Sequence, residues 1–143
     1  MSENQETLAK SEKVMKAVRE WLSEEGYKCN VDDDGDFYFK YQGKSILFIK
    51  DDDDSKYYRL VMPSIYDIEE ETDLLRIEDI CNDVSSEIKC VKAYVVKQNN
   101  SVWLTIEFFL DPENFYLDSF FQTYLDIMIG AYHLLASKIR KNN

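Results

Sequence analysis

Residues 89–111, with the sequence KCVKAYVVKQNNSVWLTIEFFLD, constrain the fold more than any other stretch of the chain. Two runs rich in β-branched and aromatic residues flank Asn99 and Asn100, and asparagine tolerates the positive φ angles of tight turns. In the second run every even-numbered residue from Val102 to Leu110 is apolar. Because successive side chains of a strand point to opposite faces, we expect a long hairpin with one face covered by helices.

Four shorter segments upstream also have the character of strands. Residues 27–31, 36–42, 44–50 and 56–64 alternate or run apolar, and residues rich in turn formers separate them. This spacing predicts a four-stranded antiparallel meander. Its third segment contains ILFI, which is apolar on both faces and is therefore typical of an interior strand.

Three segments have apolar residues at helical spacing. The first helix is predicted at about residues 5–25, and Gly26 is a plausible stop signal. The second is predicted after the acidic segment 67–73, with Thr72 as its N-cap. The third is predicted at roughly 114–140, where Gly130 in the middle of the helix indicates close contact with a neighbouring element.

Together these elements predict a single α+β domain over residues 1–143, in the order α-β-β-β-β-α-β-β-α, with an antiparallel sheet packed by helices. A chain of 143 residues can bury a core without disulfides or metal. The three cysteines, Cys29, Cys81 and Cys90, form no C-x-x-C pair. We therefore expect them to be buried, reduced thiols.

The composition bears on partners and location. The formal net charge is −11, from 28 acidic and 17 basic residues, and no basic stripe interrupts it. Such a chain repels phosphate backbones and anionic headgroups, so nucleic acid and membrane surfaces are poor partners. Neither a signal-peptide core nor a run of about 18 apolar residues is present. We expect a cytoplasmic protein.

The stretch NVDDDGDFYF at residues 30–39 has part of the pattern of a calcium-binding loop. With Gly35 at position six, four oxygen-bearing residues fall on ligand positions one, three, five and seven: Asn30, Asp32, Asp34 and Asp36. Position twelve, however, needs a bidentate Glu and is Tyr41, and a strand follows in place of a helix. We therefore predict a tight turn in which Asp33 and Asp34 make local contacts and Gly35 adopts the left-handed conformation. Weak divalent-ion binding here or at residues 51–54 stays an open alternative.

Two longer segments support a resemblance to a known family. They are VREWLSEEGYKCNVDDDGDFYFKYQGKSILF and LLRIEDICNDVSSEIKCVKAYVVKQNNSVWLTIEFFL, in which a helix carrying Asn82 precedes the long hairpin. In these segments the chain resembles the YbjN-like family of bacterial sensory-transduction regulators, whose domains are similar in fold to type III secretion chaperones. The resemblance covers most of the chain and implies a fold and a habit of binding proteins. It implies no active site.

No catalytic pattern is visible in the sequence. It has no Gly-rich phosphate loop and no serine elbow, and its one histidine, His133, falls in an apolar helix. We expect no catalytic residues, no cofactor and no metal site, and hence not an enzyme. Two hypotheses remain: a non-enzymatic protein-binding module, chaperone-like or a regulatory adaptor, and a regulator that responds to a small molecule or an ion.

The final hairpin provides the candidate contact residues. Since its even-numbered face is expected to be covered, the opposite face, with Tyr94, Trp103 and Thr105, is the candidate contact surface for a partner. The expected partner is a neutral or basic segment of another protein, captured at a sheet edge or in a groove. A second copy of the chain, forming a homodimer, is the other candidate.

Overall fold

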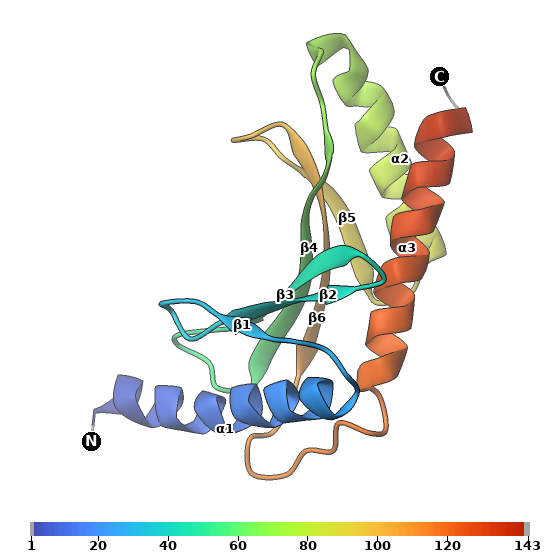
Figure 1. Ribbon diagram of the computed structural model, residues 1–143. Helices are drawn as coiled ribbons and strands as arrows, with labels where there is room; N and C mark the ends of the chain where they lie inside the picture. Colours follow the sequence, from blue (N-terminus) through green and yellow to red (C-terminus); the bar gives the residue numbers. More distant parts are fainter. Residues whose placement is uncertain (1, 142–143) are drawn as a thin grey trace. The chain divides into compact units, whose positions relative to one another are not determined.

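The computed structural model describes residues 2–141 and has the predicted order of elements (Figure 1). The helices are α1 (Glu3–Glu24), α2 (Leu74–Glu87) and α3 (Phe121–Lys141), and a 3-10 turn, η1 (Glu71–Asp73), precedes α2. The strands are β1 (Asn30–Val31), β2 (Phe37–Tyr41), β3 (Lys44–Lys50), β4 (Tyr57–Asp67), β5 (Val91–Val96) and β6 (Ser101–Phe109).

The six strands form one antiparallel sheet in the order β1-β2-β3-β4-β6-β5, so β3 is interior, as ILFI predicts. The chain divides into two compact units. The first comprises the residues up to Leu60 together with Glu107–Gln122, and the second comprises Val61–Ile106 together with the residues from Thr123 onward. Strands β4 and β6 contribute residues to both units. The predicted fold class, a single α+β domain with an antiparallel sheet packed by helices, is confirmed.

The first unit has an aromatic core centred on Phe48. The centroid of its ring lies 5.4 Å from that of Phe37, 5.7 Å from Tyr58, 6.1 Å from Phe108 and 6.0 Å from Phe121. Stacked, tilted and edge-on arrangements at these distances stabilise by about 0.5–1.5 kcal/mol per pair beyond area burial. Aromatic residues of β2, β3, β4, β6 and the start of α3 therefore hold this unit together.

Helix α1 has signals at both ends. Ser2 and Gln5 form a reciprocal capping box, in which each side chain accepts a bond from the backbone N–H of the other. After Glu25, Gly26 adopts a φ of +96°, which confirms the predicted stop. One face of the helix is buried in the first unit, including Val14 and Leu22.

The aspartate-rich stretch forms a turn between β1 and β2, as predicted, but a different residue organises it. The Asp32 carboxylate accepts hydrogen bonds from the backbone N–H groups of Asp34 (2.9 Å) and Asp36 (3.1 Å). The expectation that Asp33 and Asp34 make these contacts is wrong. Asp32 stands at the first position of the turn, where an Asx side chain reaches the amides that follow it.

Gly35 has a φ of +87°, which confirms the predicted left-handed conformation. A Cβ at this position would also lie 3.3 Å from Cε of Lys50. We expect Gly35→Val to lower the free energy of unfolding by about 1–2 kcal/mol, because a β-branched residue is strained at positive φ. Urea denaturation measures the effect. An unchanged midpoint would contradict the left-handed turn.

In the second unit, β5 and β6 pair from Val91↔Ile106 to Val96↔Ser101, and Asn100 adopts a φ of +50° in the connecting turn. The even-numbered residues of the second strand, with Leu110 just beyond it, are all buried, as predicted: Val102, Leu104, Ile106, Phe108 and Leu110. Polar contacts join helices α2 and α3. Nη1 of Arg76 donates to the carbonyl oxygen of Ile139 (3.2 Å), and Nζ of Lys138 donates to Glu87 (3.0 Å).

Two boundaries between β4 and α2 differ from the prediction. Strand β4 continues past Pro63 to Asp67, and the backbone N–H of Ile68 then donates to the Asn100 carbonyl oxygen (2.8 Å). Thr72 is not the N-cap of α2, because it lies inside η1 and Asp73 occupies the cap position. The Asp73 carboxylate makes no capping bond. It accepts from Nε of Arg76 (2.7 Å), which holds the pKa of Asp73 below its usual value.

The last helix begins at Phe121, seven residues later than the predicted residue 114. The segment before it is a loop, in which the Asp111 side chain accepts from the backbone N–H of Glu113 (3.0 Å). The local bonds of Asp111 compete with helix formation. The prediction for Gly130 is also wrong, since it is exposed and nothing lies within 4 Å of a Cβ placed there.

Candidate functional site

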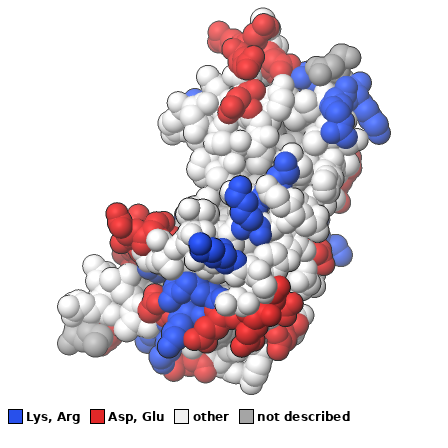
Figure 2. Space-filling model, viewed as in Figure 1, with Lys and Arg blue, Asp and Glu red and all other residues white. Residues whose placement is uncertain are grey.

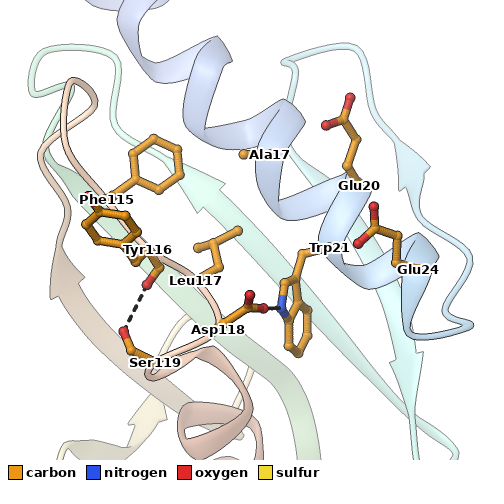
Figure 3. Close-up of a pocket in the computed structure, with 9 residues that line it drawn as sticks. All are labelled: Ala17, Glu20, Trp21, Glu24, Phe115, Tyr116, Leu117, Asp118 and Ser119. Carbon is orange, nitrogen blue, oxygen red and sulfur yellow. Dashed lines mark hydrogen bonds between the residues drawn. The ribbon is translucent and has the colours of Figure 1, made fainter.

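The first unit contains a groove of about 700 Å³ between the C-terminal half of α1 and the loop that leads to α3 (Figure 3). The helix and the loop contribute its nine lining residues: Ala17, Glu20, Trp21, Glu24, Phe115, Tyr116, Leu117, Asp118 and Ser119. Five of these residues are exposed, so the groove is open to solvent: Glu20, Glu24, Tyr116, Asp118 and Ser119.

Trp21 connects the two walls of the groove. Its Nε1 donates to Oδ1 of Asp118 at 2.7 Å, which Figure 3 shows as a dashed line. Its ring also meets the ring of Phe121 edge-on, at 5.2 Å between centroids, and Phe121 is fully buried. The indole is thus held by a carboxylate at its N–H and by an edge-on ring contact with the core.

The loop wall is held by bonds to its own backbone. Ser119 Oγ donates to the Tyr116 carbonyl oxygen (3.1 Å), and the backbone N–H of Phe121 donates to the Leu117 carbonyl oxygen (2.9 Å). Leu117 is buried, whereas 73% of Tyr116 is exposed. In Figure 3 the rings of Phe115 and Tyr116 lie on the loop side and the two glutamates on the helix side. The loop therefore anchors itself with Leu117 and presents aromatic surface to water.

The charge of the groove is acidic. Glu20 and Glu24 stand four residues apart, on one face of α1, and Asp118 supplies a third carboxylate. None of the nine lining residues is basic. Among the described residues, Glu20 and Glu24 have no ion-pair partner within 4.0 Å. Carboxylates beside aromatic faces can bind a cation with an apolar stem.

The structure brings together the three contact residues that the sequence predicts. Tyr94 lies directly opposite Trp103 in the β5–β6 pair, and its hydroxyl is 2.7 Å from Oγ1 of Thr105. Nε1 of Trp103 donates to Oγ of Ser101 at 3.0 Å. Tyr94 and Trp103 are half-buried, and only 3% of Thr105 is exposed. These residues share a face, as the alternation predicts, and their role as partner contacts stays a prediction.

The groove is not predicted by the sequence. Residues 115–119 were assigned to the predicted last helix, because Leu117 and Phe120 fit a helical stripe. One signal could have revealed the loop: DPENFYLDS, residues 111–119, has five residues of the types that favour turns or local side-chain bonds among nine. No comparable signal in the sequence pairs this loop with Trp21.

The cysteines differ in their surroundings. Burial and, to a lesser extent, the charge of Glu78 raise the pKa of Cys81 to about 11. Burial also raises the pKa of the half-buried Cys29, although Arg19 opposes the shift. Cys90 is exposed, which corrects the expectation that all three are buried, since it occupies the turn between α2 and β5 with a φ of +70°. A raised pKa disfavours the nucleophilic thiolate at Cys29 and Cys81.

Within residues 2–141, no three His, Cys, Asp or Glu side chains gather closely enough to hold a metal ion. No helix in the described part of the chain is long and apolar enough to cross a membrane.

Comparison with known proteins gives a likeness in fold alone. The sequence matches no protein-family model and no curated protein. The structure is similar to the crystal structure of an uncharacterized protein from Methanothermobacter thermautotrophicus, with a TM-score of 0.57 and 14% sequence identity. The match covers 89% of this chain and 96% of that one. The resemblance to the YbjN-like family therefore stays a prediction.

Proposed function

We propose that this chain is a non-enzymatic protein-binding module, which holds a segment of another protein in the groove between α1 and residues 115–119. The main support for this proposal is the exposed aromatic surface of the groove, where Tyr116 is 73% exposed and Trp21 and Phe115 line the same groove. Tyr and Trp are enriched where proteins meet, because they combine a large apolar area with a polar group. The aromatic surface of such a groove is more stable when a peptide covers it than when it is exposed to water.

The sheet edges favour a groove over strand addition as the mode of capture. At the β5 edge, Ser85 Oγ accepts from the Ala93 backbone N–H (2.8 Å) and donates to its carbonyl oxygen (3.3 Å). The opposite edge strand, β1, has only two residues. Blocked and short edges are common ways to prevent pairing with another strand. The β5 edge is thus blocked at Ala93, and β1 offers an incoming segment only a short edge.

The resemblance to the YbjN-like family and to type III secretion chaperones agrees with a binding role, in the cytoplasm. A regulator that responds to a small molecule or an ion is the alternative. Ligand sites for small molecules usually enclose most of the ligand, whereas five of the lining residues of this groove are exposed. The open form of the groove therefore supports a polypeptide as the occupant.

The test is peptide selection with matched variants. A phage-displayed library of random dodecapeptides is selected on the intact protein, and binders are measured on Tyr116→Ser and on Leu75→Ser. Leu75 is a control of similar exposure, 75%, on α2 in the second unit. We expect Tyr116→Ser to weaken the selected peptides at least tenfold and Leu75→Ser to change binding less than twofold. Peptides that bind Tyr116→Ser as well as they bind the parent, or no selected peptide at all, would overturn the proposal.

A further inference from the structure

The last turn of α1 is acidic, whereas Lys16 and Arg19 stand in the turns before it and line a neighbouring pocket together with Glu20. The last turn contains no basic residue, and Glu24 is the final residue of the helix, followed by Glu25. The C-terminal end of a helix is already the negative end of its dipole, where cations stabilise and carboxylates destabilise. By contrast, α3 ends with Lys138, Arg140 and Lys141. Figure 2 shows acidic side chains gathered over the C-terminal part of α1.

The same end of α1 forms the helix wall of the groove. Glu20 and Glu24 belong to this last part of the helix, and Asp118 lies on the loop side, beside the Trp21 indole. Of the three carboxylates of the groove, Asp118 accepts a hydrogen bond from the Trp21 indole. Glu20 and Glu24 make no polar contact with the described residues. A positive group in the groove would therefore meet both the helix dipole and two carboxylates.

The aromatic lining adds a second preference for a cation. Trp21 and Tyr116 both line the groove. Aromatic rings attract cations, and Trp does so most strongly. Arg and Lys also carry apolar stems that pack along surfaces such as those of Leu117 and Ala17 while the charged end stays in water. A side chain with an apolar stem and a positive end matches both parts of the groove.

We propose that the occupant of the groove is a basic segment of a partner protein, with a Lys or Arg side chain directed to Glu20 and Glu24. This inference rests on the proposed function and specifies its partner. The net charge of −11 adds a long-range attraction for such a segment, which speeds association and weakens with added salt. An acidic segment would be repelled by the same charges.

Three synthetic pools of amphipathic dodecapeptides test this inference. All share the same Leu, Phe and Tyr positions, and the remaining positions hold Lys and Arg, Ser and Gln, or Asp and Glu. Binding is followed by fluorescence anisotropy at 50 and 200 mM salt. We expect the basic pool to bind at least tenfold more tightly than the neutral pool, the acidic pool to bind least, and the advantage of the basic pool to shrink at the higher salt.

Matched charge variants localise the effect. Glu20→Gln/Glu24→Gln removes two exposed carboxylates one turn apart on α1, and Asp79→Asn/Asp83→Asn removes an equivalent exposed pair on α2. We expect the α1 variant to weaken the basic pool at least fivefold and the α2 variant to weaken it less than twofold. Because the α1 variant also relieves repulsion at a helix C-terminus, its Tm is expected to rise by roughly 2 °C.

The outcomes separate the two proposals. If the neutral pool binds as tightly as the basic pool and Tyr116→Ser still weakens both, the groove binds peptides but the basic occupant is wrong. Equal losses in the α1 and α2 charge variants would also overturn the basic occupant, because they would show only the effect of net charge. If Tyr116→Ser weakens no pool, the groove is not the binding site, and both proposals fail.

Discussion

Phe48→Ala is expected to lower the free energy of unfolding by about 3–5 kcal/mol, the largest effect of any substitution considered. Phe48 is fully buried, and its ring contacts four other aromatic rings of the first unit. Removing the ring leaves a cavity whose rigid aromatic walls cannot easily close. Urea denaturation followed by circular dichroism measures the loss.

Phe109→Ala is the matched control, since it removes the same side chain from an exposed position. Phe109 is 72% exposed and contacts the ring of Tyr57 at 5.7 Å. Because most of the Phe109 ring is already in water, the variant loses little buried apolar area. We therefore expect its free energy of unfolding to fall by about 1 kcal/mol or less. Similar losses in the two variants would show that Phe48 is not the centre of the core.

Trp103→Ser is expected to lower the free energy of unfolding by about 2 kcal/mol, less than a fully buried aromatic residue and more than an exposed one. Trp103 is half-buried opposite Tyr94, and its N–H is bonded to Ser101. Trp103→Phe is the control, because it keeps most of the ring area and loses only the N–H bond. We expect Trp103→Phe to lower the free energy of unfolding by about half as much as Trp103→Ser, or less.

The same variant tests the predicted contact face. Sedimentation of folded Trp103→Ser shows whether self-association depends on this residue. A folded variant that loses self-association supports a homodimer through Tyr94 and Trp103. A variant that is unfolded at 25 °C shows that Trp103 belongs to the core, and the contact assignment then fails.

The strands and their faces could be predicted because side-chain alternation is a local property. The apolar series from Val102 to Leu110 determines which face of β6 is buried, whatever covers it. The start of α3 was predicted too early for a related reason. Leu117 is apolar and buried at helical spacing, yet it packs from a loop, and spacing alone cannot separate these two cases.

The groove could not be predicted because it depends on contacts between distant parts of the chain. Trp21 and Asp118 are separated by 97 positions, and neither belongs to a motif that requires the other. The alternation of the final hairpin pointed instead to Tyr94, Trp103 and Thr105. The structure adds what the pattern could not contain, namely that Thr105 is buried beside the Tyr94 hydroxyl.

The bonds between Ser85 and Ala93 also make one backbone amide dependent on the docking of a helix. Ala93 lies in an edge strand, where an outward-facing amide would normally exchange its hydrogen with solvent through small local fluctuations. Its N–H is instead held by a hydroxyl from α2. Exchange at Ala93 then requires α2 to move away from β5, so the protection of this single amide measures how often that helix detaches from the sheet.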